Sequence, residues 1–261
     1  MQNFFLVFPL LGLACNMHHE KKYLHEISSG LSAQITQKHI SDSNSWEYFL
    51  QHLAEKKGAI LNYKGTLIND QSKHVAIINY DVGTRDLQQC ADALMRLRAE
   101  YLFSQKRYNE IGFHFTNGDF YSLLDYCNGK KPRPAGQDVD FFYSTPQLIN
   151  AQSLRRYLDL VYTYAGTISL ANELKGCSEF AIGTVVVTPG SPGHCFIISN
   201  EATTSSGEKL YKLVEGFTPA QSIYVLKNIS EPELGAWHRL KKGRIITASY
   251  EFNSYKLKRF E

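Results

Sequence analysis

Five strand-like stretches follow one another in the last third of the chain, and no long helical pattern interrupts them. They are rich in β-branched and aromatic residues, and turn residues separate them at residues 183–188, 194–199, 209–217, 222–227 and 244–252. Such a series predicts an antiparallel meander. The earlier part of the chain mixes short strands with two long helical patterns, which begin near residues 85 and 151. We therefore expect the α+β class, with an antiparallel sheet packed against a helical part.

No composition shift or flexible linker divides residues 43–255, so we expect a single α+β domain there. Residues 111–180 contain the second long helical pattern, which Asn150 caps and Gly166 interrupts, and this segment is predicted to form a helical lobe. The chain has 261 residues, 43% of them hydrophobic, which is enough to bury a sizeable core.

The first fifteen residues form an apolar stretch that ends in Leu13-Ala14-Cys15. This pattern predicts a signal peptide with a lipobox at residues 1–15, in which Cys15 is lipidated, followed by a polar tether at 16–42. The alternative is a buried N-terminal strand or helix. No apolar stretch reaches 18 residues, so membrane attachment is expected through the lipid anchor only. The predicted location is the cell envelope, on its periplasmic or outer-membrane side.

The charges indicate no nucleic-acid partner, because the formal net charge is only +3 and the basic residues are scattered. No metal-type spacing of Cys and His occurs, so we expect neither a metal nor another cofactor. The cysteines besides Cys15 are Cys90, Cys127, Cys177 and Cys195, and the sequence does not choose among their three complete pairings. It leaves the oligomeric state open as well.

His194 is the first candidate for chemistry. Two prolines and two glycines at residues 189–193 break a strand-like run and deliver this histidine to the start of the next strand. The following residues are apolar throughout, which indicates a central strand. An imidazole at the open end of a central strand is well placed for acid–base chemistry. The alternative is a loop histidine that packs under the proline turn.

Cys90 is the candidate nucleophile because it lies near the start of a predicted helix. The helix dipole favours a thiolate there, and Gln89 is a candidate donor to an oxyanion. The alternative is a structural cysteine, because Cys90 falls on the apolar face of the helix. In addition, Asp86 and Gln89 have the spacing of a capping box, which would place Cys90 a full turn inside the helix.

Glu215 is the third candidate, since its strand pairs with that of His194 through the hairpin at residues 200–208. A carboxylate at that end can orient the imidazole and fix its tautomer. Glutamate also ends strands for solubility. His74 begins an earlier strand in a similar context, KHVAII beside GHCFII, and is either a second cleft histidine or a surface residue.

The segment Gly193-His194-Cys195-Phe196-Ile197 resembles the histidine-bearing strand of NlpC-type cell-wall peptidases, a branch of the papain-like superfamily. This resemblance implies a papain-like form of the α+β class, with Cys90 as nucleophile and His194 as base. The residues around Cys90 differ from that family's Asp-Cys-Ser pattern.

A wider resemblance covers most of residues 43–255. The stretches DVGTRDLQQCADALMRLRAEYLFSQKRY, YAGTISLANEL, SPGH and PAQSIYVLKN are similar to a family of uncharacterised bacterial lipoproteins with a domain of unknown function. That similarity implies export and lipid anchoring, and it carries no established activity.

Two functional hypotheses follow from the sequence. The first is an envelope cysteine hydrolase that acts on amides, with a peptide or peptidoglycan fragment as its partner; Cys90, His194, Glu215 and Gln89 supply the chemistry. The second is a non-catalytic envelope protein whose cleft binds glycan or peptide through aromatic side chains, with Tyr101, Tyr162, Tyr164 and Trp237 as candidates. A Cys90 sulfur that lies within about 4 Å of an imidazole nitrogen of His194 and is open to solvent supports the first. A Cys90 that is buried without a histidine partner supports the second.

Overall fold

The computed structural model describes residues 35–136 and 138–261. The predicted signal, Cys15 and most of the predicted tether lie outside the described residues. The last part of the tether lies inside them, and there β1 (Ile35–Gln37) pairs with β10. The sheet therefore begins within the segment that the sequence assigned to the tether. Among the described helices, none is long and apolar enough to cross a membrane.

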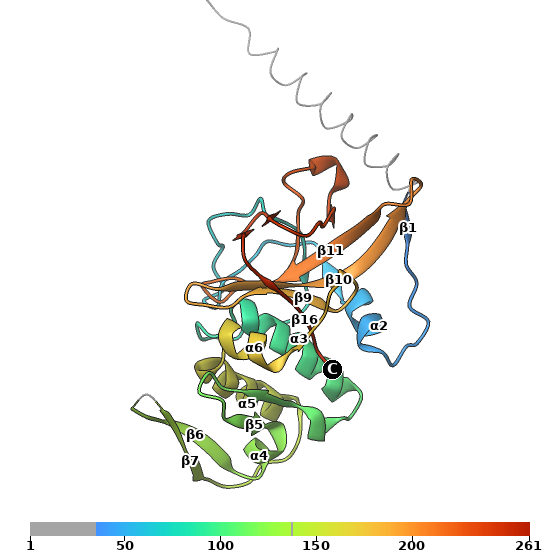
Figure 1. Ribbon diagram of the computed structural model, residues 1–261. Helices are drawn as coiled ribbons and strands as arrows, with labels where there is room; N and C mark the ends of the chain where they lie inside the picture. Colours follow the sequence, from blue (N-terminus) through green and yellow to red (C-terminus); the bar gives the residue numbers. More distant parts are fainter. Residues whose placement is uncertain (1–34, 137) are drawn as a thin grey trace, which may run out of the picture.

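An antiparallel sheet forms one layer of the structure (Figure 1). Its strand order is β2-β3-β12-β11-β10-β9-β16-β8, with β1 also pairing with β10 and β13 with β11. The predicted α+β class is confirmed. The strands are β2 (Glu55–Lys56), β3 (His74–Ile78), β8 (Lys175–Gly176), β9 (Thr184–Thr188), β10 (His194–Thr204), β11 (Lys209–Glu215), β12 (Tyr224–Leu226), β13 (Trp237–His238) and β16 (Lys256–Arg259).

Helices cover one face of this sheet, with α3 lying directly against β10 (Figure 1). The helices of the described residues are α2 (Trp46–Gln51), α3 (Cys90–Ser104), α4 (Leu123–Cys127), α5 (Ala151–Tyr164) and α6 (Thr167–Glu173), with short 3-10 turns at η1 (Tyr108–Glu110) and η2 (Pro232–Leu234). Small hairpins complete the fold: β4 (Gly112–His114) with β5 (Phe120–Ser122), β6 (Lys130–Ala135) with β7 (Asp138–Tyr143), and β14 (Ile245–Ile246) with β15 (Glu251–Phe252).

The central strands are apolar throughout because both of their faces are buried. On β10, Cys195 and Ile197 belong to the core cluster that includes α3. Phe196 and Ile198 belong to a second cluster on the opposite face, where Phe252 near the C-terminus also packs. The continuous apolar runs that predicted central strands therefore reflect two separate cores.

Helix α3 begins later than the possible Asp86 cap implied. Asp86 does not cap it, because its Oδ1 accepts the backbone N–H of Ala220 at 2.7 Å. Gln89 is the N-cap instead, and its own N–H donates to Asp92 Oδ2 at 3.0 Å. Cys90 is thus the first residue of the helix rather than a residue one turn inside it.

The predicted cap and break in the second long helix are both present. Asn150 Oδ1 accepts the backbone N–H of Ser153 at 2.9 Å, and α5 begins at the next residue after this cap. The helix ends before Gly166, which is the N-cap of α6. Between residues 111 and 180, the chain forms the β4–β5 and β6–β7 hairpins as well as α4, α5 and α6.

Candidate active site

His194 is the first residue of β10 and is almost fully buried. The preceding Gly193 allows three backbone and side-chain groups to close around this position. A Cβ on Gly193 would lie 2.4 Å from Thr167 Oγ1 and 2.7 Å from the carbonyl oxygens of Gly190 and Thr188. The proline–glycine loop thus folds tightly against α6, and only glycine fits before the histidine.

Glu215 is the last residue of β11 and is completely buried. Ile197 pairs with Val214 across the two strands, so Glu215 lies on the same face of the sheet as His194. Its Oε2 accepts a hydrogen bond from His194 Nε2 at 2.8 Å. The predicted partnership of these two residues is present, and it leaves Nδ1 as the ring nitrogen available to another group.

Tyr224 holds the other oxygen of this carboxylate. Its hydroxyl donates to Glu215 Oε1 and lies 3.0 Å from Ser249 Oγ. The hydrogen bonds therefore form a chain from β12 through β11 to β10. Lys73 lies above the Tyr224 ring, with its ammonium 5.2 Å from the ring centroid.

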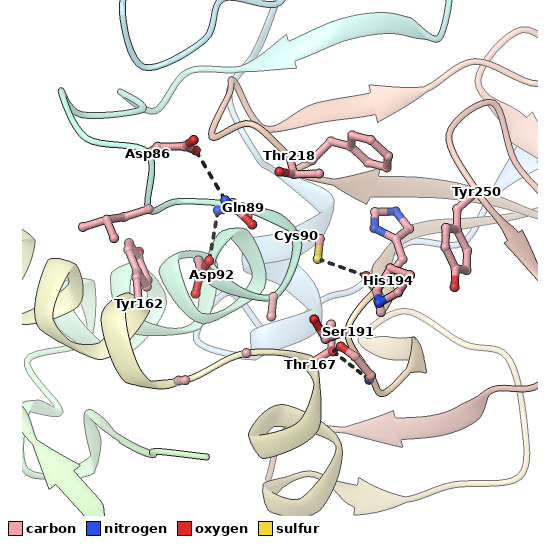
Figure 2. A pocket seen from close by; sticks show the side chains of 18 residues that line it. Asp86, Gln89, Cys90, Asp92, Tyr162, Thr167, Ser191, His194, Thr218 and Tyr250 are labelled. Atoms are coloured by element: carbon pink, nitrogen blue, oxygen red, sulfur yellow. Dashed lines mark hydrogen bonds between the residues drawn. The ribbon is translucent and has the colours of Figure 1, made fainter. Parts of the chain in front are cut away.

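The Cys90 thiol and the His194 imidazole line the same pocket at the edge of the sheet. Cys90 is partly exposed, and its sulfur lies 3.9 Å from the carbonyl oxygen of Gly193 and points to the side where His194 lies (Figure 2). Strand pleating directs His194 away from the α3 face, whereas Cys195 points toward α3. The two reactive groups still meet because each is the terminal residue of its element.

The ionisation of the pair matches this geometry. Hydrogen bonds from the Cys195 thiol and from His194, together with the His194 charge, lower the pKa of Cys90 to about 5, although burial opposes the shift. Burial by itself would lower the pKa of His194, but the Glu215 carboxylate and the Cys90 sulfur outweigh it and raise that pKa to about 9. At neutral pH the pair is therefore a thiolate and an imidazolium, an activated state for a cysteine nucleophile.

A pocket of about 370 Å³ opens beside the pair. Phe217 and Tyr250 flank the imidazole, with ring centroids 5.0 Å and 5.1 Å from its own. These rings limit the access of water to the ion pair. The pocket is lined by Asp86, Leu87, Gln89, Cys90, Ala91, Asp92, Tyr162, Ala165, Gly166, Thr167, Gly190, Ser191, Pro192, Gly193, His194, Phe217, Thr218 and Tyr250.

Gln89 also lines the pocket, next to Cys90 in the chain. Its side-chain Nε2 donates to Asp86 Oδ1 at 3.3 Å, which leaves one amide hydrogen for a ligand. The first backbone N–H groups of a helix have no intrahelical acceptor, so the N–H of Cys90 is a second candidate donor.

Several residues singled out from the sequence lie away from the pocket. His74 is at the start of β3, where its Nε2 hydrogen-bonds the carbonyl oxygen of Gly58 at 2.8 Å. Of the four aromatic residues considered for ligand binding, only Tyr162 lines the pocket. Tyr101 packs against Trp46, and Tyr164 packs against Phe115.

Three contributors to the site were missed in the sequence: Tyr224, Asp92 and Gly216. Gly216 has a local signal, because it directly follows a buried glutamate at the end of a strand. A Cβ there would lie 2.7 Å from Ala93 Cβ and 2.8 Å from the carbonyl oxygen of Gln89. This glycine lets β11 approach the tip of α3 and so brings Glu215 to the same edge as Cys90.

The thiols of Cys90, Cys127, Cys177 and Cys195 are all free, which resolves the pairing that the sequence left open. Within residues 35–136 and 138–261, no group of three or more His, Cys, Asp or Glu side chains is arranged to hold a metal ion.

Comparison with known proteins yields one match. No curated protein and no solved structure matches the chain. The family described as Domain of unknown function (4846) matches residues 32–259, a span that runs from just before β1 to the end of β16 and contains Cys90, His194 and Glu215. Because this match takes in the whole sheet and every residue of the pocket, the chain belongs to the Domain of unknown function (4846) family.

Proposed function

We propose that this protein is a cysteine hydrolase of the cell envelope that cleaves amide bonds, with peptides of the peptidoglycan type as its substrates. One observation carries the proposal: Cys90 at the tip of α3 lines the same pocket as His194, whose Nε2 is bound to the buried Glu215. The neighbouring His194 helps to lower the pKa of the Cys90 thiol. A nucleophile, a base and an orienting carboxylate in this order are the components of cysteine hydrolases.

The first step is acyl transfer to the sulfur. The Cys90 thiolate attacks the carbonyl carbon of the substrate amide, and the carbonyl oxygen becomes an oxyanion that Gln89 Nε2 and the Cys90 N–H stabilise. The C–N bond then breaks as the imidazolium of His194 gives its proton to the leaving amine. The products of this step are a free amine and a thioester on Cys90, with His194 neutral.

The second step is hydrolysis of that thioester. Neutral His194 removes a proton from a water molecule, which attacks the thioester carbon. The C–S bond breaks, the carboxylic acid leaves, and the thiolate and imidazolium are restored. Glu215 does not react, and its hydrogen bond to Nε2 keeps Nδ1 directed to the reaction.

The papain-like character of the site is part of the proposal. Cysteine on the first turn of a helix and histidine at the start of an antiparallel strand is the arrangement that papain-like enzymes use. The resemblance of residues 193–197 to NlpC-type peptidases supports a peptide of the cell wall as substrate.

Export and lipid anchoring rest on the N-terminal sequence, where Cys15 follows Leu13 and Ala14 at the end of an apolar stretch. Expression in a bacterium fed with labelled palmitate is expected to label the wild-type protein but not a Cys15→Ala variant. Equal labelling of both proteins, or of neither, would contradict the anchor without affecting the hydrolase proposal.

Thiol mapping tests the catalytic site directly. A short exposure to iodoacetamide at pH 6, followed by peptide mass spectrometry, is expected to modify Cys90 ahead of the partly exposed Cys177, because the lowered pKa of Cys90 makes it a thiolate at that pH. The matched control is the His194→Ala variant, in which Cys90 is no longer expected to be modified ahead of Cys177. Modification of Cys177 at the same rate as Cys90 would contradict an activated nucleophile.

Turnover is the second readout. Peptidoglycan peptides released by muramidase digestion are incubated with the wild-type protein and with Cys90→Ala, and new amines and carboxylates are followed by mass spectrometry. Cleavage by the wild type alone supports the hydrolase. Binding of the peptides without cleavage by either protein would favour the non-catalytic envelope cleft instead.

A further inference from the structure

The pocket has an acidic wall on the far side of the tip of α3 from Cys90. Asp86 and Asp92 line the pocket, and no lysine or arginine does. Cys90 and Asp92 are the first and third residues of the same helix, and Figure 2 shows their side chains on the two sides of its tip. A ligand that spans the pocket therefore reaches a carboxylate as well as the nucleophile.

Asp92 has one oxygen without a partner. Its Oδ2 accepts the N–H of Gln89 at 3.0 Å, whereas its Oδ1 is buried and has no hydrogen-bond partner. The residue is only 6% exposed. Burial raises the pKa of this carboxyl well above its usual range. A buried carboxyl group with an unpartnered oxygen still lacks a hydrogen bond that a ligand can supply.

Tyr162 on α5 adds a second unpartnered atom to the same pocket. Its hydroxyl is buried without a hydrogen-bond partner, and the side chain is 6% exposed. Burial raises the pKa of this hydroxyl; the nearby Arg96 opposes the shift, and the nearby Asp92 adds to it. The two groups are therefore neighbours, and both line the space that a ligand would occupy.

Arg96 does not satisfy this pair. It lies one helical turn beyond Asp92 and close to Tyr162, but its guanidinium is bound to Glu100 at 2.6 Å, Asp81 at 3.2 Å and Gln88 at 3.5 Å. It does not line the pocket.

We propose that Asp92 and Tyr162 form a subsite for a protonated primary amine of the substrate. An ammonium group carries three donors, and the two unpartnered oxygens can accept two of them. Burial favours the protonated form of Asp92, and the positive charge of a bound ammonium group would instead stabilise the ionised form. The inference deepens the proposed hydrolase: its substrate carries a free amino group on the α5 side of the bond that Cys90 attacks.

The test uses alkylating agents that differ only in charge. The full chain is treated with ω-bromoalkylammonium compounds of two to six carbons and with the matching ω-bromoalkanols, and alkylation rates at Cys90 and Cys177 are measured by mass spectrometry. For at least one chain length, we expect the ammonium compound to exceed the alcohol at Cys90 by about tenfold, with a ratio near one at Cys177.

Two variants assign that preference to the subsite. Asp92→Asn keeps an oxygen for the Gln89 N–H, and Tyr162→Phe keeps the ring, so both are expected to fold, with thermal unfolding as the check. The charge preference is the ratio of the two alkylation rates at Cys90, ammonium compound over alkanol. Each variant is expected to lower this ratio, and Asp92→Asn is expected to bring it near one. Asp140→Asn, an exposed position on β7, removes the same charge and is expected to leave the preference unchanged.

The outcomes separate this inference from the proposed function. Cys90 can react with iodoacetamide faster than Cys177 and yet show no preference for the ammonium compounds, or show a preference that Asp92→Asn retains. In either case the amine subsite is wrong and the hydrolase proposal stands. If Cys90 prefers the bromoalkanols, the wall binds a neutral group and the subsite is likewise wrong. If Cys90 is no more reactive than Cys177 toward any reagent, the hydrolase itself fails.

Discussion

The starts of β3 and β10 look alike in sequence and differ in chemistry. Both strands begin with a histidine followed by apolar residues, as KHVAII and GHCFII. His74 is partly exposed and hydrogen-bonds the carbonyl oxygen of Gly58. His194 is buried, bound to Glu215 and in contact with Cys90. The difference shows that the residues that surround a strand terminus decide whether its histidine can act as an acid or a base.

What surrounds each histidine follows from its neighbours in the sheet. β10 is central, between β9 and β11, and the tip of α3 lies at its start. β3 pairs with β12 and with the two-residue strand β2 near the edge of the sheet. Tyr224 on β12 separates the two sites, with its ring 6.3 Å from that of His74 and its hydroxyl on Glu215.

Removal of each imidazole gives the largest contrast. His194→Ala is expected to slow alkylation of Cys90 at pH 6 by about tenfold or more, because the thiolate loses its positive partner and its pKa rises toward the ordinary value of about 8.5. The loss of thiolate at this pH outweighs the higher nucleophilicity of a more basic thiolate. His74→Ala is the matched change at the other strand start and is expected to leave the rate unchanged. Similar losses in both variants would show that the two histidines act through stability alone.

Glu215→Gln removes the charge that distinguishes His194 from His74. The pKa of His194 is about 9 in the wild type, and the variant is expected to lower it by about two units toward the ordinary value near 6.5. The proposed hydrolysis needs the imidazolium, which is present below a pH of about 9 and lost above it. It also needs the thiolate, which is present above a pH of about 5 and lost below it. The plateau between these limits should shrink from its alkaline side in the variant.

NMR titration of the histidine ring protons measures this shift directly. The signal of His74 serves as the internal reference within each sample. An unchanged alkaline limit in Glu215→Gln would mean that the carboxylate does not set the charge state of His194.

Gly216→Ala tests the close approach of β11 to α3. The added Cβ would lie 2.7 Å from Ala93 Cβ, so the strand and the helix tip must separate. We expect a loss of about 1–3 kcal/mol in the free energy of unfolding, the usual cost of overpacking, and slower alkylation of Cys90. Gly176→Ala, where a Cβ meets nothing within 4 Å, is the control. Equal unfolding midpoints for the two variants would show that the approach is loose.

Tyr224→Phe is expected to have the smallest effect of the four. The variant keeps the ring between the two strand starts and removes only the hydroxyl that donates to Glu215. We expect the Cys90 alkylation rate at pH 6 to fall less than fivefold, because the hydrogen bond between His194 and Glu215 remains, and stability to fall by about 1–2 kcal/mol. A loss as large as that of His194→Ala would make Tyr224 part of the reacting group.

Much of the fold could be read from local patterns. The apolar run after His194 identified a central strand, and Asn150 and Gly166 marked the limits of α5, because strand burial and helix capping depend on nearby residues. The start of α3 was harder, since Asp86 has the spacing of a cap but is bound by Ala220 from a distant loop.

The candidate site also has features that the sequence predicted and features that depend on distant residues. The sequence by itself determined which side chains were available: a cysteine near a helix start, a histidine delivered by a glycine-rich loop, and a glutamate at the end of the paired strand. Only the tertiary structure decided that Cys90 is the first residue of its helix and meets His194, and that Tyr224 and Asp92 join them. The physical reason is that ionisation and hydrogen bonding depend on distance in space, and the packing of α3, β11 and β12 brings together residues that are far apart along the chain.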